Sequence, residues 1–279
     1  MPSVPASAAP RPRLGIRWTI GDVSPRGFEA LRLSLWGAWR LFGAEARYGV
    51  AVNTVSPGEA LRRTGPVPDA VAWHPAHGLP APLAERLDAG MAEGVAWKFA
   101  PPRLFPDLAE LSLDNDVILW DLPEALRLWL DDPAGGPFVL AEDVAAAFGR
   151  FAPWCGPEPR NLGIRGLPAG FDLVAALAGL LDAAPGPLAS ELDEQGLQVA
   201  ALQRAGACRT VTLDEVSVCS PFWPHRPELG LCGAHFVGLN ARHIPWRYYD
   251  RPATEVRAEH WEGHRAALYR RVGLDAPAA

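Results

Sequence analysis

Short apolar runs recur along the chain, and their β-branched and aromatic residues favour strands over helices. The first run, Leu14–Ile20, is followed by the polar segment that begins at Gly21. Runs of the same kind predict further strands over residues 48–52, 70–73, 111–120 and 210–213. Each run is short and bounded by polar or turn-forming residues, which is typical of the strands of a β-sheet.

Segments with helical spacing separate these runs. Ser24 and Pro25 form a good N-cap and first-turn pair, and apolar side chains then recur at helical spacing as far as Phe42, just before Gly43. This pattern predicts an amphipathic helix over residues 25–42. Residues 101–108 are expected to form a short helix or a loop. Further helices are expected over residues 140–148, 171–181, 187–204 and 253–272.

Strands that alternate with helices predict βαβ units, so we expect an α/β fold with a mostly parallel central sheet flanked by helices. The sequence has no internal repeat and no convincing linker, which favours a single domain over residues 13–279. Residues 1–12 are rich in Pro, Ala and Ser and are expected to be a disordered tail. Ligands of such sheets bind at the carboxyl ends of the strands, where Asn53 and residues 114–116 lie.

The composition argues against several classes of protein. The 279 residues carry a net charge of −6 with a pI near 5.7, which argues against a nucleic-acid-binding protein. No apolar run approaches the length of a transmembrane helix, and the first residues lack the apolar stretch of a signal peptide. The cysteines have no C-x-x-C spacing, which argues against a zinc site and favours reduced thiols in a cytoplasmic protein. They are Cys155, Cys208, Cys219 and Cys232.

Two carboxylates stand in the apolar run over residues 111–120. Asp114 and Asp116 are spaced i, i+2, so in a strand both side chains point to one face, while Asn115 points the other way or turns the chain. Ionised aspartates in apolar surroundings are costly unless a cation compensates them, and their hard oxygen ligands suit Mg²⁺ or Mn²⁺. The alternative is a strand that ends in a polar Asp-Asn turn.

A second group of polar residues stands in apolar surroundings over residues 232–246. His235 is a suitable third ligand for Mn²⁺, and Gly238 allows the backbone to approach a phosphate. Arg242 offers a forked donor for a diphosphate. The alternative is a strand in which His235 makes a local hydrogen bond.

Together these segments resemble the metal-dependent nucleotide-sugar glycosyltransferases of the GT-A fold, most closely family eight. That family pairs an early D-x-D with a late H-x-x-G-x-x-K-P-W segment, which residues 113–116 and 235–246 match. The second match departs from the pattern, since six residues separate Gly238 from Pro245 where the pattern has three, and Ile244 takes the place of the lysine. The family's N-S-G segment is represented by Asn161-Leu162-Gly163, and its D-Q segment is similar to Asp193-Glu194-Gln195.

The resemblance implies a GT-A-like fold whose nucleotide-binding half covers about residues 13–120 and whose acceptor half covers about residues 121–279. It implies a nucleotide-diphosphate sugar as donor, a sugar or small-molecule acceptor, and Mn²⁺ or Mg²⁺ held by Asp114, Asp116 and His235. Asn161 and Gln195 are expected at the donor sugar, and Asp193 or Glu194 as base or electrostatic stabiliser, although Asp193 also suits a helix cap. The residues expected at the nucleotide and its phosphates are Asn53, Lys98, Arg103, Asp114, Gly238 and Arg242.

Of the two basic residues before the D-x-D segment, Arg103 is the preferred candidate, and solvated surface charges are the alternative for both. His260 and His264 have metal-like spacing on the last predicted helix, but without H-E-x-x-H the pattern favours a solvated helix surface. The chain has no G-x-S-x-G, Walker A or G-x-G-x-x-G motif. Two functions remain open, a metal-dependent glycosyltransferase and a non-catalytic protein that binds nucleotide or carbohydrate on the same scaffold.

Overall fold

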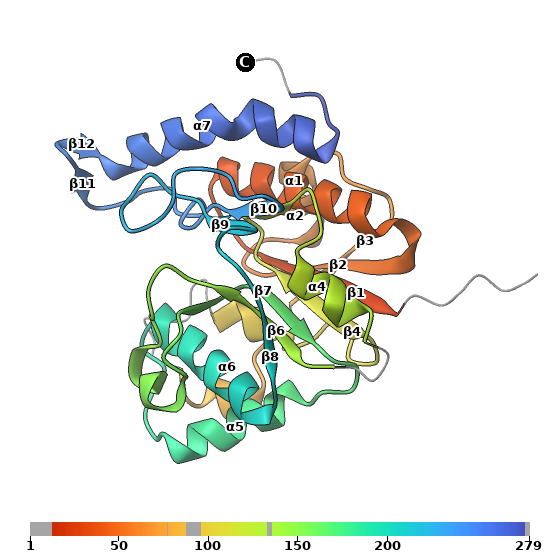
Figure 1. Ribbon diagram of the computed structural model, residues 1–279, viewed down its shortest axis with the longest axis vertical. Helices are drawn as coiled ribbons and strands as arrows, with labels where there is room; N and C mark the ends of the chain where they lie inside the picture. The colour runs from red at the N-terminus through yellow and green to blue at the C-terminus, as the bar shows by residue number, and fades with distance from the viewer. Residues whose placement is uncertain (1–12, 77, 88–95, 133–135, 277–279) are drawn as a thin grey trace, which may run out of the picture.

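A seven-stranded sheet forms the centre of the molecule (Figure 1). The computed structural model describes residues 13–76, 78–87, 96–132 and 136–276, and the tail predicted over residues 1–12 lies outside them. The strands follow the order β3-β2-β1-β4-β7-β6-β8. They are β1 (Leu14–Ile20), β2 (Ala46–Val52), β3 (Val71–Pro75), β4 (Ala109–Leu113), β6 (Phe138–Glu142), β7 (Arg160–Leu167) and β8 (Cys208–Val211).

The sheet is mostly parallel, as predicted. β1 pairs in parallel with β2 and β4, β2 with β3, and β6 with β8, whereas β7 runs antiparallel to its neighbours β4 and β6. The apolar runs predicted over residues 14–20 and 48–52 lie at β1 and β2 of this sheet, which are buried on both faces along almost their whole length.

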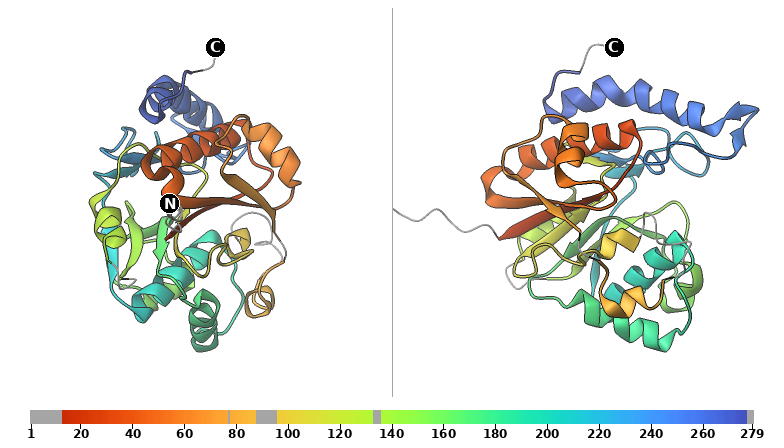
Figure 2. Two further views of the ribbon diagram at one scale, coloured as in Figure 1. Left: turned by 90° about the vertical axis from the view of Figure 1, so that its right-hand side faces the viewer. Right: turned by 180° about the vertical axis from the view of Figure 1, so that it is seen from behind.

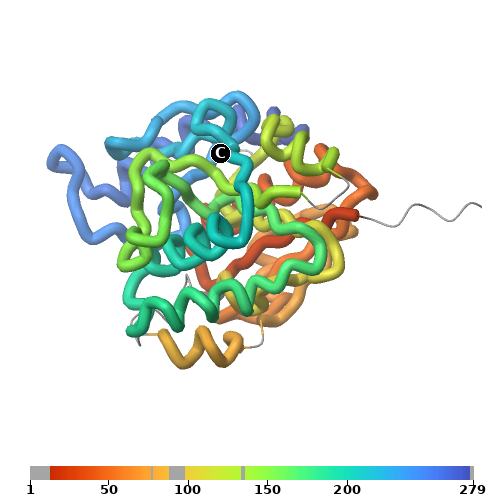
Figure 3. Tube along the Cα trace, turned by 60° about the horizontal axis from the view of Figure 1, so that its bottom comes forward, coloured from red at the N-terminus to blue at the C-terminus, as the bar shows by residue number. Residues whose placement is uncertain are grey.

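Helices cover both faces of the sheet (Figure 2). On one face lie α1 (Pro25–Phe42), α2 (Pro57–Thr64) and α7 (Ala253–Val272), and on the other α5 (Leu173–Ala183) and α6 (Glu191–Ala205). The bounds predicted for α1 and α7 are confirmed; Ser24 caps α1 by accepting a hydrogen bond from the Gly27 amide over 3.0 Å. Short helices complete the fold: α3 (Ala81–Ala84), which packs on α5 (Figure 3), and α4 (Glu124–Leu130).

The helix predicted over residues 140–148 is wrong. The segment begins inside β6, continues as a turn and precedes the 3₁₀ helix Gly149–Trp154. Alternate side chains of β6 enter two different buried clusters, Val139 and Ala141 one and Phe138 and Leu140 the other, so the strand is apolar on both faces and lacks the period of two that marks a half-exposed strand. Such a run cannot be distinguished from a buried helix by its hydrophobic pattern.

A second, three-stranded sheet lies beside the first. It consists of β5 (Val117–Leu119), β10 (Gly233–His235) and β9 (Val216–Val218), with β10 antiparallel to β5 and parallel to β9. Apolar side chains of α1, α7 and this sheet share one buried cluster, which includes Ile118, Phe236 and Trp261. The small sheet is therefore packed against α1 and α7.

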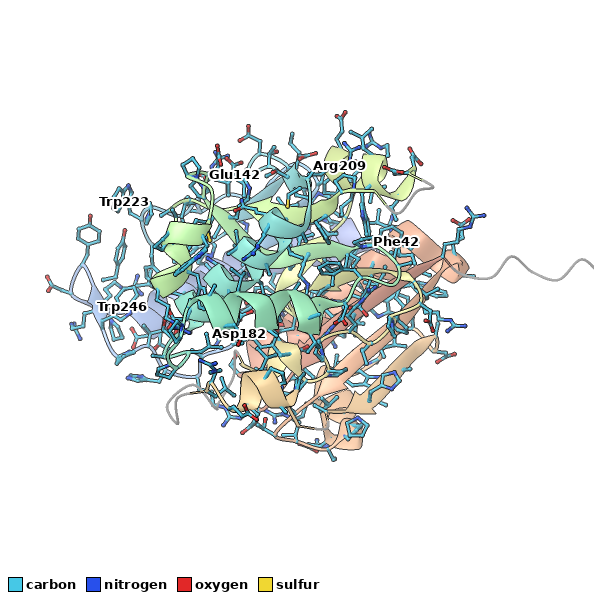
Figure 4. All side chains as sticks on the ribbon, turned by 90° about the horizontal axis from the view of Figure 1, so that it is seen from below. Phe42, Glu142, Asp182, Arg209, Trp223 and Trp246 are labelled. Atoms are coloured by element: carbon cyan, nitrogen blue, oxygen red, sulfur yellow. The ribbon has the colours of Figure 1, made fainter. Side chains whose placement is uncertain are left out.

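The chain between β10 and α7 forms the hairpin of β11 (Arg247–Tyr248) and β12 (Arg251–Pro252), at one end of the molecule. Trp246 packs edge-on against Phe222, and Trp223 is 86% exposed; Figure 4 labels both tryptophans at this end. In the part of the chain that the structure describes, no helix combines the length and the apolar character needed to span a membrane.

Candidate metal centre

The two aspartates of the D-x-D segment lie in a tight turn that joins the two sheets. β4 ends at Leu113 and β5 begins at Val117, whose amide donates to the carbonyl of Asp114 over 3.0 Å. The single strand predicted over residues 111–120 is therefore wrong, and the alternative of an Asp-Asn turn describes the backbone. The chain must turn here because β4 pairs in the large sheet and β5 in the small one.

Asn115 holds this turn in place and points away from the neighbouring carboxylates. Its side-chain amide exchanges two hydrogen bonds with that of Asn240, over 2.7 and 2.9 Å, and donates a third to the Gly27 carbonyl of α1. Asn115 is buried, so these bonds satisfy groups that would otherwise be costly. The turn is thereby tied both to α1 and to the segment that follows His235.

His235 reaches the carboxylates from β10. It pairs with Val117 across the antiparallel strands β5 and β10, and the next residue, Phe236, donates its amide to the Asp116 carbonyl over 2.9 Å. The His235 Nε2 atom lies 3.4 Å from Asp116 Oδ1 and 3.7 Å from Asp114 Oδ2. The structure thus brings together the three predicted ligands, with one ligand atom of each within 4.8 Å of the others.

This donor set fits a divalent cation. Asp116 and His235 are buried, and Asp114 keeps 21% of its side chain exposed, which leaves an open side for a ligand. Burial lowers the pKa of His235, but its hydrogen bond to Asp116 and the charges of Asp116 and Asp114 outweigh it and raise the pKa overall. Two carboxylate groups and one imidazole are the ligands that Mn²⁺ accepts, and a bound cation would compensate their charge.

β7 supports the centre from the other side. The Gly163 carbonyl accepts from the Asp114 amide over 2.9 Å, and a Cβ atom at Gly163 would lie 2.5 Å from the His235 ring. Asn161, predicted at the donor sugar, instead uses its side chain on backbone groups: it accepts from the Gly163 amide and donates to the Glu142 carbonyl. These bonds hold β7 beside β6 at the point where their register shifts.

Of the two basic residues before β4, Lys98 is the one that contacts a predicted metal ligand. Its Nζ atom lies 2.9 Å from each carboxylate oxygen of Asp114. Burial lowers the pKa of Lys98, but the charges of Asp114 and Glu194 outweigh that effect and raise it. Arg103, the preferred candidate from the sequence, donates instead to the Pro168, Phe171 and Leu108 carbonyls, where it holds a loop.

A group of buried charges beneath Lys98 was not predicted. Arg17 in β1 donates to the Pro101 and Pro102 carbonyls over 2.6 and 2.8 Å, and so holds the segment that follows Lys98. Glu110 in β4 accepts from the amides of Leu104 and Phe105, and Arg165 in β7 donates to Gln198 of α6. A signal for them was present in the sequence, because Arg17, Glu110 and Arg165 each interrupt an apolar strand.

Glu194 of α6 joins this buried group. Its carboxylate accepts from Gln198, and burial, opposed by the charges of Lys98 and Arg165, raises its pKa to about 7. Asp193 instead accepts from the amides of Ala189 and Arg150, which makes it part of the helix cap. Gln195 donates to the Ala147 carbonyl over 2.9 Å. Of the three consecutive candidates, Glu194 is therefore the one whose charge acts on Lys98.

A cavity of about 470 Å³ opens beside the N-terminus of α1, and its lining is rich in arginine. Arg257 donates to the Gly238 carbonyl, and Arg242 pairs with Asp22 at the end of β1. Gly238 has a φ of +77°, which favours glycine. Leu239 lines the cavity and donates its amide to the carbonyl of Phe236, whose own amide donates to the carbonyl of Asp116, so the cavity lies close to the candidate metal centre. The arginines of the lining are Arg26, Arg63, Arg242 and Arg257.

Asn53 follows β2 directly, at the edge of the sheet where it was predicted. Its amide donates to the Ile20 carbonyl over 2.9 Å, and its side-chain oxygen accepts from the Thr54 hydroxyl. Asn53 is buried between the ends of β1 and β2, since a Cβ atom at Gly21 would lie 2.3 Å from its Oδ1 atom.

No protein-family model matches this chain, and no curated protein matches it in sequence. Solved structures match it in fold. An active-site glutamine-to-glutamate mutant of LgtC superposes with a TM-score of 0.52 at 14% identity, over 89% of this chain and 95% of that one. The galactosyltransferase LgtC with donor and acceptor sugar analogues gives 0.51 at 14%, over 89% and 99% of the two chains.

Mouse xyloside xylosyltransferase 1 in its apo form gives a TM-score of 0.50 at 13% identity, over 83% of this chain and 99% of that one. Each match covers more than four fifths of this chain, so it concerns much more than one βαβ unit. The protein has the GT-A fold of these glycosyltransferases, as the sequence motifs predicted.

Proposed function

We propose that this protein is a metal-dependent glycosyltransferase, which moves a sugar from a nucleotide-diphosphate sugar to a hydroxyl group of an acceptor. The observation that carries the proposal is the convergence of Asp114, Asp116 and His235 where the two sheets meet. The structural neighbours include a galactosyltransferase and a xylosyltransferase, which supports glycosyl transfer as the reaction class.

The chain's own residues supply the binding of the donor. Asp114, Asp116 and His235 would hold Mn²⁺ or Mg²⁺, which when bound neutralises charge on the departing diphosphate. Lys98 brings a cation against Asp114 at the same edge, and Arg242 and Arg257 line the adjacent cavity. Guanidinium groups bind phosphate oxygens with forked geometry, so we assign this cavity to the phosphates of the donor.

The reaction exchanges one bond for another at the anomeric carbon. The bond from that carbon to the diphosphate breaks and a bond to the acceptor oxygen forms, while the proton of the acceptor hydroxyl passes to the departing diphosphate or to solvent. Glu194 is buried and has a pKa of about 7, and its charge raises the pKa of Lys98 and so stabilises the positive charge of that lysine. We assign it the part of an electrostatic stabiliser that the sequence left open between Asp193 and Glu194.

Calorimetry with Mn²⁺, UDP and GDP tests this function. We expect one of the two nucleotides to bind only when Mn²⁺ is present, and Asp116→Asn to abolish that binding. Asp182→Asn is a matched control, because Asp182 is an exposed aspartate of α5 whose partner is Arg86. If neither nucleotide binds at millimolar concentration with Mn²⁺, the proposal is wrong.

A non-catalytic binding protein is the second candidate, and the replacement of the expected lysine by Ile244 favours it. Ile244 is buried, and its amide donates to the Thr254 hydroxyl, so the position offers no cation to a phosphate. The two functions differ in turnover: a transferase releases nucleoside diphosphate from a bound nucleotide sugar, whereas a binding protein does not. A cytoplasmic location stays a prediction, for which the four unpaired cysteines are the support.

A further inference from the structure

A second cluster of metal-binding side chains lies on the far side of β10 from the aspartates. His260 and His264, one turn apart on α7, each place Nε2 2.8 Å from the carbonyl oxygen of Pro227. The Cys219 Sγ atom lies 3.9 Å from His260 Nε2 and 3.6 Å from the same carbonyl oxygen. The ligand atoms of Cys219, His260 and His264 all lie within 4.8 Å of one another.

The backbone builds this cluster from three separate segments. Cys219 directly follows β9, and its amide donates to the His235 carbonyl over 2.7 Å. The loop after it folds back, because the Arg226 amide donates to the Val218 carbonyl, and this places Pro227 beside the thiol. α7 then lays both imidazoles over the pair, where each ring lies 6.1 Å from the ring of Phe236.

The spacing of these atoms suits a tetrahedral zinc ion. With Zn–S near 2.3 Å and Zn–N and Zn–O near 2.0 Å, tetrahedral geometry separates neighbouring ligand atoms by about 3.3 to 3.6 Å. The observed sulfur-to-oxygen and sulfur-to-nitrogen distances are 3.6 and 3.9 Å, and the nitrogen-to-oxygen distances are 2.8 Å. These distances differ from the tetrahedral values by about 0.5 Å or less, so small shifts of the ligand atoms would complete the geometry.

The ligand types separate this cluster from the first one. A thiolate and two imidazoles are soft or borderline ligands, which favour Zn²⁺ over Mg²⁺ and Mn²⁺. The sequence favoured a solvated helix surface for His260 and His264, whereas in the structure both are partly buried and converge on the Pro227 carbonyl.

We propose that Cys219, His260 and His264, with the carbonyl oxygen of Pro227, form a structural Zn²⁺ site. On binding, the Cys219 thiol loses its proton to solvent and becomes a thiolate. Each histidine binds the ion through Nε2 and keeps its proton on Nδ1. The ion would connect α7 to the end of β9, the strand that pairs with the His235 strand β10. This site does not depend on the proposed transferase function.

The competing interpretation is a hydrogen-bonded cluster that binds no metal. The Pro227 carbonyl has two lone pairs and is able to accept from both imidazoles, while the buried thiol simply fills the core. The two interpretations differ in one property, since the cluster without metal has no specific affinity for Zn²⁺.

Calorimetric titration of the full chain with ZnCl₂ alone tests the proposal. It is performed in the Asp116→Asn variant, so that zinc binding at the aspartates does not contribute. We expect one equivalent of Zn²⁺ to bind with release of a proton, and to raise the melting temperature. His264→Gln should weaken this binding by about tenfold or more, and His225→Gln, a histidine that contacts the Phe222 carbonyl, should leave it unchanged.

Cobalt provides a readout for the sulfur ligand. Co²⁺ in place of Zn²⁺ should give a thiolate-to-cobalt charge-transfer absorption, which Cys219→Ser removes and Cys232→Ser preserves. Because Cys219 is buried, circular dichroism must first show that Cys219→Ser is folded. If it is unfolded, His264→Gln decides the case, because His264 is partly exposed. The absence of a one-equivalent Zn²⁺ site, or an affinity that His264→Gln does not change, would overturn the proposal.

Discussion

At the scale of single residues, Gly163 shows how closely the backbone approaches the candidate metal centre. A Cβ atom there would lie 2.5 Å from two atoms of the buried His235 ring, much closer than van der Waals contact. We expect Gly163→Ala to displace the imidazole and to weaken Mn²⁺ binding by about tenfold. Gly179→Ala is the matched control, because a Cβ atom at Gly179 meets nothing within 4 Å. Equal Mn²⁺ affinities in the two variants, measured by calorimetry, would show that His235 is not a ligand.

Glu194 is a buried residue whose carboxyl group titrates near neutral pH. Its pKa rises from 4.5 to about 7 on folding, so the folded protein binds more protons than the unfolded chain in this interval. The contribution of Glu194 to the free energy of unfolding therefore falls as pH rises, by at most about 3 kcal/mol between these values.

We expect Glu194→Gln to flatten this dependence, so that wild type loses more stability than the variant between about pH 5 and about pH 8. Urea denaturation of both proteins at the two pH values measures the difference. Glu191→Gln, an exposed residue of the same helix, should follow the wild type. Parallel pH dependences for wild type and Glu194→Gln would mean that Glu194 is already ionised near pH 5.

At the scale of elements, the turn between β4 and β5 depends on a side-chain pair. Asn115 and Asn240 exchange two hydrogen bonds and join this turn to the segment after β10. Truncation of either residue leaves the other unsatisfied, so each alanine variant should lose about 1 to 3 kcal/mol of stability. The double variant should lose clearly less than the sum of the two. A double-mutant cycle by urea denaturation checks this, and additive losses would contradict the pairing.

The helices and strands also show which local signals were sufficient. The ends of α1 followed from Ser24, Pro25 and Gly43, because caps act through contacts within a few residues. The end of β6 was misassigned as the start of a helix, since its apolar character reflects burial on both faces of the sheet, which no local pattern reveals. The D-x-D turn was taken as a continuous strand because both flanking strands are apolar, although they belong to different sheets.

At the scale of the whole molecule, the candidate metal centre joins the large sheet to the small one. Ligands that bind only the folded protein raise its stability, by about 2.7 kcal/mol at a concentration a hundred times the dissociation constant. We therefore expect Mn²⁺ together with the preferred nucleotide to raise the melting temperature of the whole domain in one transition. Nucleotide without metal should have no such effect, and neither ligand should stabilise Asp116→Asn. A shift of equal size in that variant would place the binding elsewhere.

By itself, the sequence determined the α/β fold class, the positions of β1, β2, β3, α1 and α7, and three residues whose side chains converge and whose role as metal ligands stays a prediction, Asp114, Asp116 and His235. These follow from periodicity, caps and ordered motifs, which are properties of neighbouring residues. Only the tertiary structure decided that Lys98 and not Arg103 contacts Asp114, and that Glu194 is the candidate that acts on Lys98. It alone brought Cys219 to His260 and His264, 41 residues and more along the chain. These contacts depend on burial and on distances between residues far apart in the chain. Charges and ligand atoms interact through space, whereas the sequence gives only their order along the backbone.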